Sequence, residues 1–430
     1  MNIVIPKPVN EVLTILYENN YDGYIVGGTV RNLILGIKPK NYQISTNASL
    51  KVVEKLLKDY DTFYCGEKNS VLGIANPRFP MEISTYHTTS NNLEDELMEK
   101  DFTMNAMAFS EEDGLIDYTT GIIDIRDKVI RINGEDDTIF VKDPLRILRA
   151  IRLSAEYGMR IDRETQEYMY DNKDLLANVA KERIRDELSK LLVAYRADFY
   201  IKKYFDIFLV IIPELALIEN FMTNDPRHIY DVLEHTLVTI KKIDPVLELR
   251  LAMLFHDIAK PFTFSKDENG IGHFKDHAKK GAEMAREILN RFKFNKKTIQ
   301  KVAKLIEYHE YEIPEKDLKI KEFLSEFGRE DIEDLFKVKK INFYAKNPAY
   351  VSDLSIIEAQ YERLANANKK TYFIKRNELK ISGRDLIDLG LSQESIGESI
   401  DRIYREILAG NLKNNHDKII AYAVENLLSN

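Results

Sequence analysis

The sequence of 430 residues contains a single cysteine, Cys65. One thiol excludes a disulfide framework and also excludes a zinc site built from cysteines. No apolar run reaches the length of a membrane span, and the first residues lack the apolar core of a secretion signal. We therefore expect a protein of the reducing cytoplasm that has no membrane partner.

An excess of positive charge is also lacking. Lysine and arginine number 62 against 70 aspartates and glutamates, which gives a formal net charge of -8. This balance excludes a protein that coats nucleic acid indiscriminately, although a local basic face still allows contact with RNA. No internal repeat or low-complexity segment stands out, and 44% hydrophobic residues are enough to build the cores of about two to four domains.

The first 140 residues alternate between strand and helix patterns. An apolar run at 24–26 predicts a short strand, Gly27-Gly28 predicts a turn, and the apolar residues that follow predict a helix ending at Gly36. A strand, a glycine turn and a helix in this order expose backbone N–H groups at which a phosphate can dock. Further along, 115–117 and 129–132 are predicted to form a hairpin around Gly121.

From Asp143 onward strand signals nearly vanish, and helix follows helix with short loops. Pro144 is well placed to begin a helix. Near the C-terminus, Ser382 is predicted to cap a helix that stops at Gly390. The expected fold class is therefore an α/β head followed by an all-α neck, middle domain and tail, predominantly helical and multidomain.

Most of the eight histidines fall in one part of this helical body. His256 and Asp257 end an apolar helix, His235 lies on an amphipathic helix, His277 opens a helix and His309 closes one. Imidazoles and carboxylates on neighbouring helices suit a divalent ion, and an adjacent His-Asp pair at a helix end lets both side chains converge on it.

Taken together, these motifs resemble the class II CCA-adding and poly(A) polymerase family, whose head is a polymerase-beta-like nucleotidyltransferase. The family signature reads Gly-Gly-x-Val-Arg-Asp, Leu-Leu-Gly and Asp-x-Asp. Here it is matched by Gly27-Gly28-Thr29-Val30-Arg31-Asn32, Ile34-Leu35-Gly36 and Asn41-Tyr42-Gln43. The resemblance runs nearly end to end. It implies a nucleotidyltransferase-like head at 1–140, a helical neck binding nucleotide and RNA at 141–222, an HD domain at 223–350 and a tRNA-binding-like tail at 351–430.

In the family the two aspartates of Asp-x-Asp share one strand face and hold two Mg²⁺ ions that activate the attacking hydroxyl. Asn41 and Gln43 keep the positions and lose both negative charges. Because Mg²⁺ needs carboxylate charge to be held beside substrate phosphates, we expect no Mg²⁺ in the head and no two-metal polymerisation. Glu82, in an alternating strand at 81–86, is a candidate third ligand or a solvated strand residue.

Two further pocket motifs of the family are partly retained. Arg-Arg-Asp-x-x-x-Asn keeps Asp101 and Asn105, and Glu-Asp-x-x-Arg, which reads the base edge, keeps Asp143 and Arg146. The departures around the pocket are Asn32, Asn41, Gln43, His87, Glu99, Lys100 and Lys142. The nucleotide-binding set that the resemblance implies, active or vestigial, is Gly27, Gly28, Arg31, Asn41, Gln43, Asp101, Asn105, Asp143 and Arg146.

Arg149 and Arg152 continue a basic stripe from Arg146 along one helix, and the resemblance implies that they contact RNA. Each of these assignments has an alternative. Asp101 and Asn105 would also serve as a helix-start cap with its supporting side chain, and arginines at this spacing commonly form a solvated face.

The histidine constellation resembles an HD-domain phosphohydrolase. The resemblance implies metal ligands His235, His256 and Asp257, joined by His277 and His309 in binuclear forms, with Asn342 in place of the family's distal aspartate. Asp353 is a candidate replacement for that lost charge. The implied catalytic set is His256, Asp257 and Lys260, with Lys260 as a phosphate-binding cation. The ion would be Mn, Ni, Co, Fe or Mg, and His228 and His273 would lie beside the ligands or on the surface.

Three functions are compatible with these residues. The first is a tRNA nucleotidyltransferase-family protein with an inactive polymerase site and a metal-dependent HD phosphohydrolase that acts on a cyclic phosphate, a nucleotide or an RNA end. The second is an active CCA- or poly(A)-adding enzyme, and the third is a non-catalytic RNA-binding protein. RNA, as tRNA or a tRNA-like end, is the expected partner in each, and nucleotide is a further candidate ligand. The sequence does not predict an oligomeric state.

Overall fold

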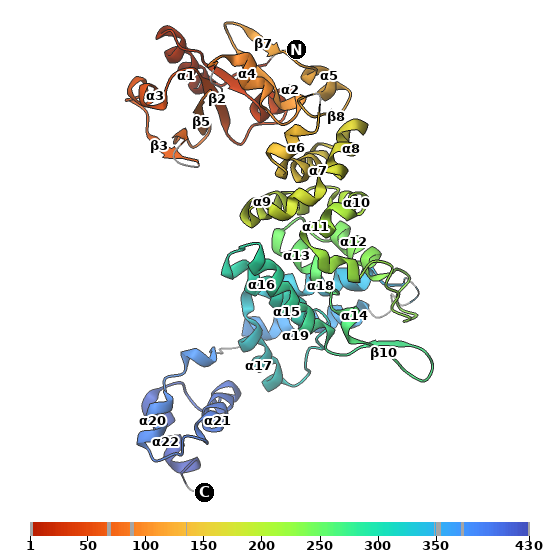
Figure 1. Cartoon of the computed structure of the whole chain (residues 1–430). Coiled ribbons are helices and arrows are strands. Elements are labelled where there is room, and N and C mark those ends of the chain that lie inside the picture. Colours follow the sequence, from red (N-terminus) through yellow and green to blue (C-terminus); the bar gives the residue numbers. More distant parts are fainter. Residues whose placement is uncertain are drawn as a thin grey trace. The chain divides into compact units, whose positions relative to one another are not determined.

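The computed structural model describes residues 3–66, 70–86, 90–134, 136–347, 349, 354–370 and 374–428. The Cα positions divide the chain into two compact units, Met1–Ile211 and Ile212–Asn430, which run from red to yellow-green and from green to blue in Figure 1. An α/β head followed by largely helical regions confirms the predicted fold class. The finer division at 140, 222 and 350 stays a prediction.

The head is built on a mixed sheet. Within the described residues seven strands pair in the order β3-β4-β5-β2-β1-β6-β7, and all pairs are antiparallel except β2 with β5. The strands are β1 Tyr24–Val26, β2 Tyr42–Thr46, β3 Thr62–Cys65, β4 Val71–Ile74, β5 Met81–Thr85, β6 Met107–Ser110 and β7 Gly114–Asp117. The predicted strands at 24–26 and 81–86 are thereby confirmed, the second one residue shorter.

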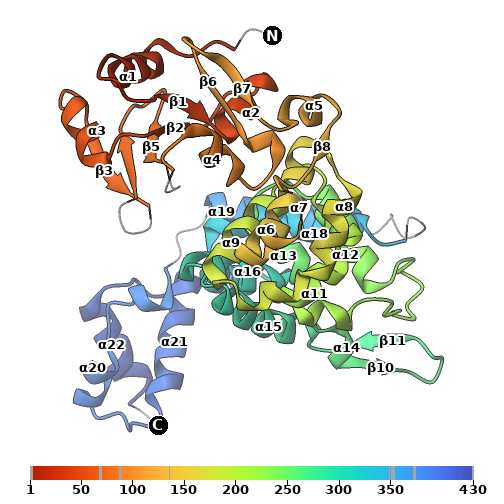
Figure 2. The same ribbon diagram turned by 45° about the horizontal axis from the view of Figure 1, so that its top comes forward.

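Short helices accompany this sheet: α1 Lys7–Glu18, α2 Gly28–Ile34, α3 Leu50–Leu56, α4 Leu93–Met98 and α5 Gly121–Arg126. Helix α1 buries Val9, Val12, Leu13 and Leu16, which recur at helical spacing along one face. It lies beside α3 (Figure 2). Between β1 and α2 the chain turns at Gly27, whose φ of 66° lies in the left-handed region that favours glycine. The predicted strand, glycine turn and helix are thus confirmed.

The predicted hairpin around Gly121 is wrong. Strand β7 pairs with β6, whereas β8, Val129–Ile130, pairs in parallel with β9, Arg160–Ile161. Gly121 opens α5 instead of a turn. A Cβ at this position would lie 2.5 Å from the carbonyl oxygen of Thr103, so the glycine serves a close backbone approach.

Helices complete the first unit: α6 Thr138–Lys142, α7 Leu145–Tyr157, α8 Arg163–Asp171, α9 Lys181–Leu192, α10 Ala197–Lys203 and α11 Phe205–Ile211. Helix α7 begins directly after Pro144, as predicted, and ends at Gly158, which has a φ of 65°. It packs against α9. Its Arg149 and Arg152 both pair with Glu187 of α9.

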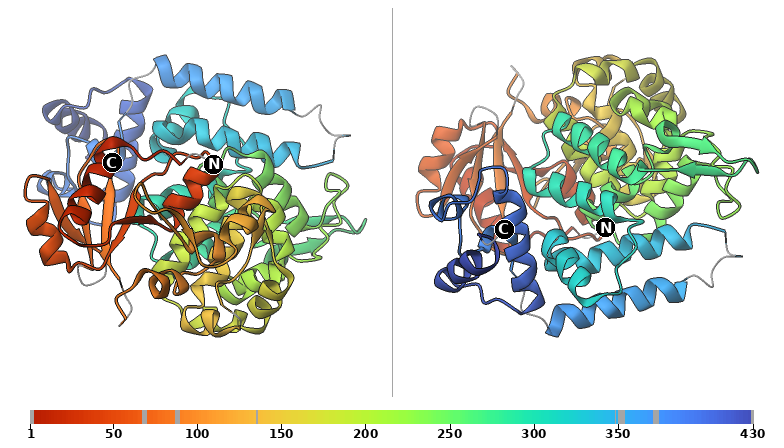
Figure 3. Two further views of the ribbon diagram at one scale, coloured as in Figure 1. Left: turned by 90° about the horizontal axis from the view of Figure 1, so that it is seen from above. Right: turned by 90° about the horizontal axis from the view of Figure 1, so that it is seen from below.

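The second unit is helical apart from one small hairpin, β10 Phe264–Lys266 with β11 Gly272–Phe274. Its helices are α12 Val232–Lys242, α13 Leu247–Phe255, α14 Lys260–Thr263, α15 His277–Arg291, α16 Lys296–Tyr308, α17 Asp317–Phe327, α18 Ile332–Tyr344, α19 Leu354–Lys370, α20 Gly383–Asp388, α21 Ile396–Ala409 and α22 His416–Asn426. Helix α13 is buried from Leu249 to Phe255 and touches α12, α15, α16 and α18. Helices α18 and α19 lie side by side in both views of Figure 3.

The last helices have a core of their own, made of Ile374, Leu386, Leu391, Ile403, Ile407, Ile419 and Ala423. The Ser382 side chain accepts a hydrogen bond from the backbone N–H of Asp385, and the Asp385 carboxylate accepts one from the backbone N–H of Ser382. Gly390 follows α20 with a φ of 101°. The predicted cap and stop are therefore confirmed. In the described part of the chain no helix is long and apolar enough to cross a membrane.

Candidate functional site

Four histidines and one aspartate meet inside the second unit. His235 comes from α12, His256 and Asp257 directly follow α13, His277 is the first residue of α15, and His309 directly follows α16. All five are buried, with His277 the most exposed at 5%. The apolar helix α13 carries the His-Asp pair into the core because its other residues are buried on every side.

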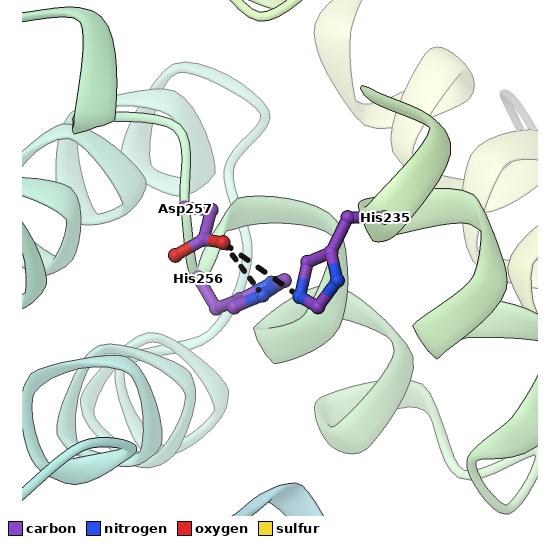
Figure 4. A group of neighbouring side chains, drawn as sticks. All are labelled: His235, His256 and Asp257. Carbon is purple, nitrogen blue, oxygen red and sulfur yellow. Dashed lines mark ion pairs between the residues drawn. The ribbon is translucent and has the colours of Figure 1, made fainter. Parts of the chain in front are cut away.

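Asp257 is the centre of this cluster. Its Oδ2 atom lies 3.2 Å from Nε2 of His256 and 3.8 Å from Nε2 of His235 (Figure 4). Its Oδ1 atom lies 3.5 Å from Nε2 of His277 and 3.7 Å from Nε2 of His309. The five side chains form two groups that share Asp257, and in each group the ligand atoms lie within 4.8 Å of one another.

Backbone carbonyls orient three of the imidazoles. Nδ1 of His256, His277 and His309 donates to the carbonyl oxygen three residues earlier, at 2.8, 2.7 and 2.6 Å. These bonds leave each Nε2 free to face Asp257, and the three Nε2 atoms and both Asp257 oxygens are buried without a hydrogen-bond partner. Buried polar atoms are almost always paired. Imidazole nitrogens and a carboxylate converging in this way fit a divalent cation.

The charge states of His235, His309 and Asp257 suit metal binding, whereas the neighbouring Asp257 raises the pKa of His277 against the effect of burial. Burial lowers the pKa of His235 well below its usual range and lowers that of His309, so both imidazoles are neutral at neutral pH. Burial opposes ionisation of Asp257, but His256 and Lys260 outweigh it and hold the pKa of that carboxyl well below its usual range. The aspartate is therefore an anion.

Asn342 and Lys260 complete the predicted set. Asn342 on α18 places its Oδ1 atom 2.9 Å from Nε2 of His235. The Nζ atom of Lys260 lies 2.7 Å from Oδ2 of Asp257, and the lysine is only 2% exposed. The structure thus brings together every side chain predicted for the HD site. Asp353 lies outside the described residues, so its role as a replacement ligand stays a prediction.

Two charged residues beside this cluster were missed from the sequence. Oε2 of Glu310 lies 3.6 Å from Nε2 of His277, and Oε1 of Glu310 lies 3.3 Å from Nζ of Lys346. Both residues line a cavity of about 380 Å³ together with Arg227, His228, Lys260, His273, His277, His309, Lys339 and Asn342. The only sequence signal for Glu310 is its place directly after His309. His228 stacks edge-on near His235, with ring centroids 5.4 Å apart.

A second, larger cavity of about 810 Å³ lies in the first unit. Its lining includes most of the predicted nucleotide-binding residues, namely Gly27, Gly28, Arg31, Asn41, Gln43, Asp101, Asn105 and Arg146, together with Arg149 and Arg152. Asp143 is not among the lining residues, and its carboxylate lies 2.8 Å from Nη2 of Arg183. His87 lies outside the described residues.

The amides that stand in for Asp-x-Asp lie at the start of β2. Asn41 directly precedes the strand and Gln43 is its second residue. Thr29 ties the two positions together, because its hydroxyl accepts from the N–H of Gln43 at 2.9 Å and donates to the carbonyl of Asn41 at 3.3 Å. Glu82 on β5 lies opposite Gln43 in the register. Asn41, Gln43 and Glu82 therefore all line the head cavity, as predicted.

A polar network links α2 to α7 across this cavity. Nη1 of Arg31 donates to Oδ1 of Asn105 at 2.6 Å, and Nδ2 of Asn105 donates to Asp101 at 2.8 Å. Nη1 of Arg149 donates to the other Asp101 oxygen at 2.8 Å. Asp101 also accepts the N–H of Phe102 at 2.9 Å; it is the centre of this network, and it does not cap the short 3-10 helix Thr103–Asn105, whose N-cap is Phe102.

The arginines of α7 are held by acidic residues of the same unit. Arg149 and Arg152 lie 3.5 Å and 2.5 Å from the two carboxylate oxygens of Glu187 on α9. Contact of these arginines with RNA stays a prediction. Two departures from the family also pair with each other, since Nζ of Lys142 lies 3.4 Å from Oε1 of Glu99. Relative to the family motifs, the two positions have exchanged their charges.

Comparison with known proteins agrees with this architecture. Residues 23–131 match the Poly A polymerase head domain, 158–218 match the probable RNA and SrmB-binding site of polymerase A, and 227–346 match the HD domain. A CC-adding tRNA nucleotidyltransferase of Thermus thermophilus is 30% identical over 322 residues, which are 70% of this chain and 71% of that protein. This chain belongs to the class II CCA-adding and poly(A) polymerase family.

Other members of the family match over shorter stretches or by fold. A CC-adding tRNA nucleotidyltransferase of Halalkalibacterium halodurans is 34% identical over 45% of this chain and half of its own length. The solved CCA-adding enzyme of Bacillus stearothermophilus, in complex with CTP, has a TM-score of 0.66 at 22% identity and covers 98% of both chains. That of Thermotoga maritima, complexed with tRNA, has a TM-score of 0.57 at 22% identity over 99% of this chain and 97% of its own.

Proposed function

We propose that the HD domain of this family member is a divalent-metal phosphohydrolase centred on Asp257. The observation that carries the proposal is the convergence of Nε2 of His256, His277 and His309 on Asp257, with the three nitrogens and Oδ1 buried without a partner and Oδ2 paired with the ammonium of Lys260. A divalent ion bound there supplies a Lewis acid and lowers the pKa of a coordinated water. The ligands on hand are His235, His256, Asp257, His277 and His309.

The cavity beside the cluster is suited to a phosphate. Arg227, Lys260, Lys339 and Lys346 line it, facing Glu310, Glu312 and Asp225. Lys260 lies against Asp257 at 2.7 Å and also borders the cavity, so it is placed to contact a phosphate held next to the cluster. In hydrolysis of a cyclic phosphate, the oxygen of water bonds to phosphorus while one ester P–O bond breaks, and the departing oxygen takes a proton.

For the head we propose binding without polymerisation. Asn41, Gln43 and Glu82 line the head cavity and place one carboxylate where the family has the charge for two Mg²⁺ ions. The preserved cavity, with Arg31, Asp101 and Asn105 in one network, supports retention of a nucleotide or an RNA end. The four-part division and the tRNA-like partner predicted from the sequence belong to this proposal.

Nucleotide addition is the second candidate function. On the comparisons alone it is the better supported of the two, because the relatives reported above are named for CC or CCA addition. The exchange of charge between Glu99 and Lys142 also favours it, since that change preserves an ion pair. The loss of both metal carboxylates is what sets it second.

Hydrolysis is tested by phosphate or phosphomonoester release from 2′,3′-cyclic nucleotides and RNA ends, with Mn²⁺, Ni²⁺ or Co²⁺ added to the full chain. We expect release by the natural protein and none by Asp257→Asn. The matched control is Asp244→Asn, at a side chain that is 58% exposed. Absence of release with every metal and every substrate contradicts the proposal.

Addition is tested separately. A tRNA lacking its 3′ end is incubated with labelled CTP or ATP and Mg²⁺ or Mn²⁺. We expect no extension above background. Robust extension makes nucleotide addition the function of the head, whatever the HD domain does. Failure of both assays, with RNA still bound, leaves a non-catalytic RNA-binding protein.

A further inference from the structure

The two oxygens of Asp257 face different surroundings. Oδ2 looks toward His235, His256 and Lys260, at 3.8, 3.2 and 2.7 Å. Oδ1 looks toward His277 and His309, at 3.5 and 3.7 Å. The five predicted ligands therefore provide two places for a cation, one on each side of the same carboxylate, and the places differ in charge.

On the Oδ2 side a positive charge is already present. The ammonium of Lys260 lies 2.7 Å from Oδ2 and is buried, so it neutralises this oxygen and repels a divalent ion. His235 is also engaged, because its Nε2 atom lies 2.9 Å from the amide oxygen of Asn342 and its Nδ1 atom lies 3.3 Å from a backbone carbonyl. An amide on α18 supplies no negative charge. Among the described residues, this side offers neither a free imidazole at His235 nor a second anion.

On the Oδ1 side the ligand atoms are free. Oδ1 itself and Nε2 of His277 and His309 have no hydrogen-bond partner, as is also the case for Nε2 of His256 on the other side, but no lysine ammonium is paired with Oδ1 among the described residues. For bonds of about 2.0 to 2.1 Å in a tetrahedral site, ligand atoms lie roughly 3.3 Å apart. The measured separations of 3.5 and 3.7 Å from Oδ1 are close to that spacing.

Among the residues that the structure describes, a second anion is found next to the ligands on the Oδ1 side. Oε2 of Glu310 lies 3.6 Å from Nε2 of His277. Its side chain is 40% exposed at the edge of the cavity, so it can move toward a cation without leaving a packed position. Asn342 on α18 stands in place of the family's carboxylate. Glu310, directly after His309, supplies a carboxylate on the opposite side of Asp257.

We infer that this chain holds a single divalent cation on the Oδ1 side, bound by Asp257, His277 and His309 with Glu310 as the additional acidic group. On the Oδ2 side, where His235 and His256 lie (Figure 4), the ammonium of Lys260 takes the place of a cation at 2.7 Å from Oδ2. Two imidazoles with two carboxylates suit Zn²⁺, Co²⁺, Ni²⁺ or Fe²⁺. The inference rests on the proposed function because both require a bound metal, and it adds the side of Asp257 on which that metal binds.

The test is metal stoichiometry and affinity in the full chain. Metal-free protein is titrated with Co²⁺, followed by its visible absorption, and bound metal is counted by mass spectrometry after dialysis. We expect one equivalent in the natural protein. Affinity should fall at least about 100-fold in His277→Gln and His309→Gln, fall less in Glu310→Gln, and persist in the matched variant His235→Gln.

Asn342→Asp gives an independent measurement that does not depend on removing a buried imidazole. Restoring the carboxylate on α18 should raise the stoichiometry toward two equivalents, and circular dichroism confirms that each variant is folded. Two equivalents in the natural protein, or loss of metal from His235→Gln with retention in His277→Gln and His309→Gln, overturns the inference alone. Absence of any bound metal overturns both the inference and the proposed hydrolase.

Discussion

Gln43 on β2 lies directly opposite Glu82 on β5 in the one parallel pair of the head sheet. Both side chains point to the exposed face of their strands, and both line the head cavity with Asn41. An amide therefore stands beside the remaining carboxylate at the place where the family binds Mg²⁺. This arrangement of two amides and one carboxylate is the basis of the proposal that the head binds a ligand without polymerising.

Restoring carboxylates at positions 41 and 43 should restore nucleotide addition. In Asn41→Asp combined with Gln43→Asp, positions 41, 43 and 82 all carry carboxylates, and we expect Mg²⁺-dependent extension of tRNA at least about 100-fold above the natural protein. Extension is measured with labelled CTP and ATP. The control, Asn19→Asp with Asn76→Asp, adds two carboxylates outside the cavity and should change nothing. Equal extension by the natural protein and the double variant would show that the amides suffice.

The pairing of Arg149 predicts a large effect on stability. Arg149 lies between Asp101 and Glu187, which are 9% and 6% exposed. Arg149→Ala leaves the buried Asp101 carboxylate without its paired cation, while Glu187 keeps its pair with Arg152, and we expect a loss of about 3 kcal/mol in the opening free energy of α7 and α9, read by hydrogen exchange of their peptides. Arg163→Ala is the control. Its side chain is 92% exposed, so its pair with Glu167 should contribute less than about 1 kcal/mol. Similar losses in both would refute the burial argument.

Local patterns predicted the elements that carry chemistry. The apolar run before His256 is long enough to be a buried helix, and a His-Asp pair at its end must then enter the core. The approach of His277 and His309 to Asp257, in contrast, followed from the resemblance, because helix spacing alone does not tell which helix ends meet. The same limit explains the wrong hairpin. The strand at Val129 pairs with one near Arg160, and nothing in either short segment names its partner.

Charged residues at the edge of the site were also not predictable from the sequence. Glu310 and Lys346 resemble ordinary solvated residues in the sequence, and only the packing of α16 against α18 brings them to the cavity. In the same way Glu99 and Lys142 were read as two independent departures from the family. Because their charged groups lie 3.4 Å apart, the two departures together form one exchange of charge within an ion pair.

Gly272, the first residue of β11, should be essential for the backbone path that leads to His277. A Cβ on Gly272 would lie 1.9 Å from the carbonyl oxygen of Thr223, so Gly272→Ala must displace backbone. We expect a loss of about 1 to 3 kcal/mol in unfolding free energy and weaker metal binding, measured by thermal unfolding and by bound Co²⁺. Gly397→Ala is the control, since it lies in α21 with nothing within 4 Å of an added Cβ. It should stabilise the chain by roughly 0.5 to 1 kcal/mol. An unchanged Gly272→Ala protein would mean that β11 is free to shift.

Lys339 should make stability depend on pH above neutrality. It is 6% exposed, and its Nζ atom donates to the carbonyl oxygen of Tyr311 at 2.7 Å. Burial lowers the pKa of Lys339 to about 8, against about 10.4 in an unfolded chain. Between these values the unfolded state binds more protons than the folded state, so this residue makes stability rise with pH there. The cost of the buried charge is fully present below pH 8.

The full rise corresponds to about 3 kcal/mol between pH 8 and 10.4. Lys339→Met removes the titrating group, so the difference in unfolding free energy between the natural protein and Lys339→Met should shift by that amount in favour of the natural protein across the window. Urea unfolding at both pH values measures it. Lys319→Met, at a side chain that is 57% exposed, should show no comparable shift. A difference that stays constant from pH 8 to 10.4 would mean that Lys339 is not held in its buried position.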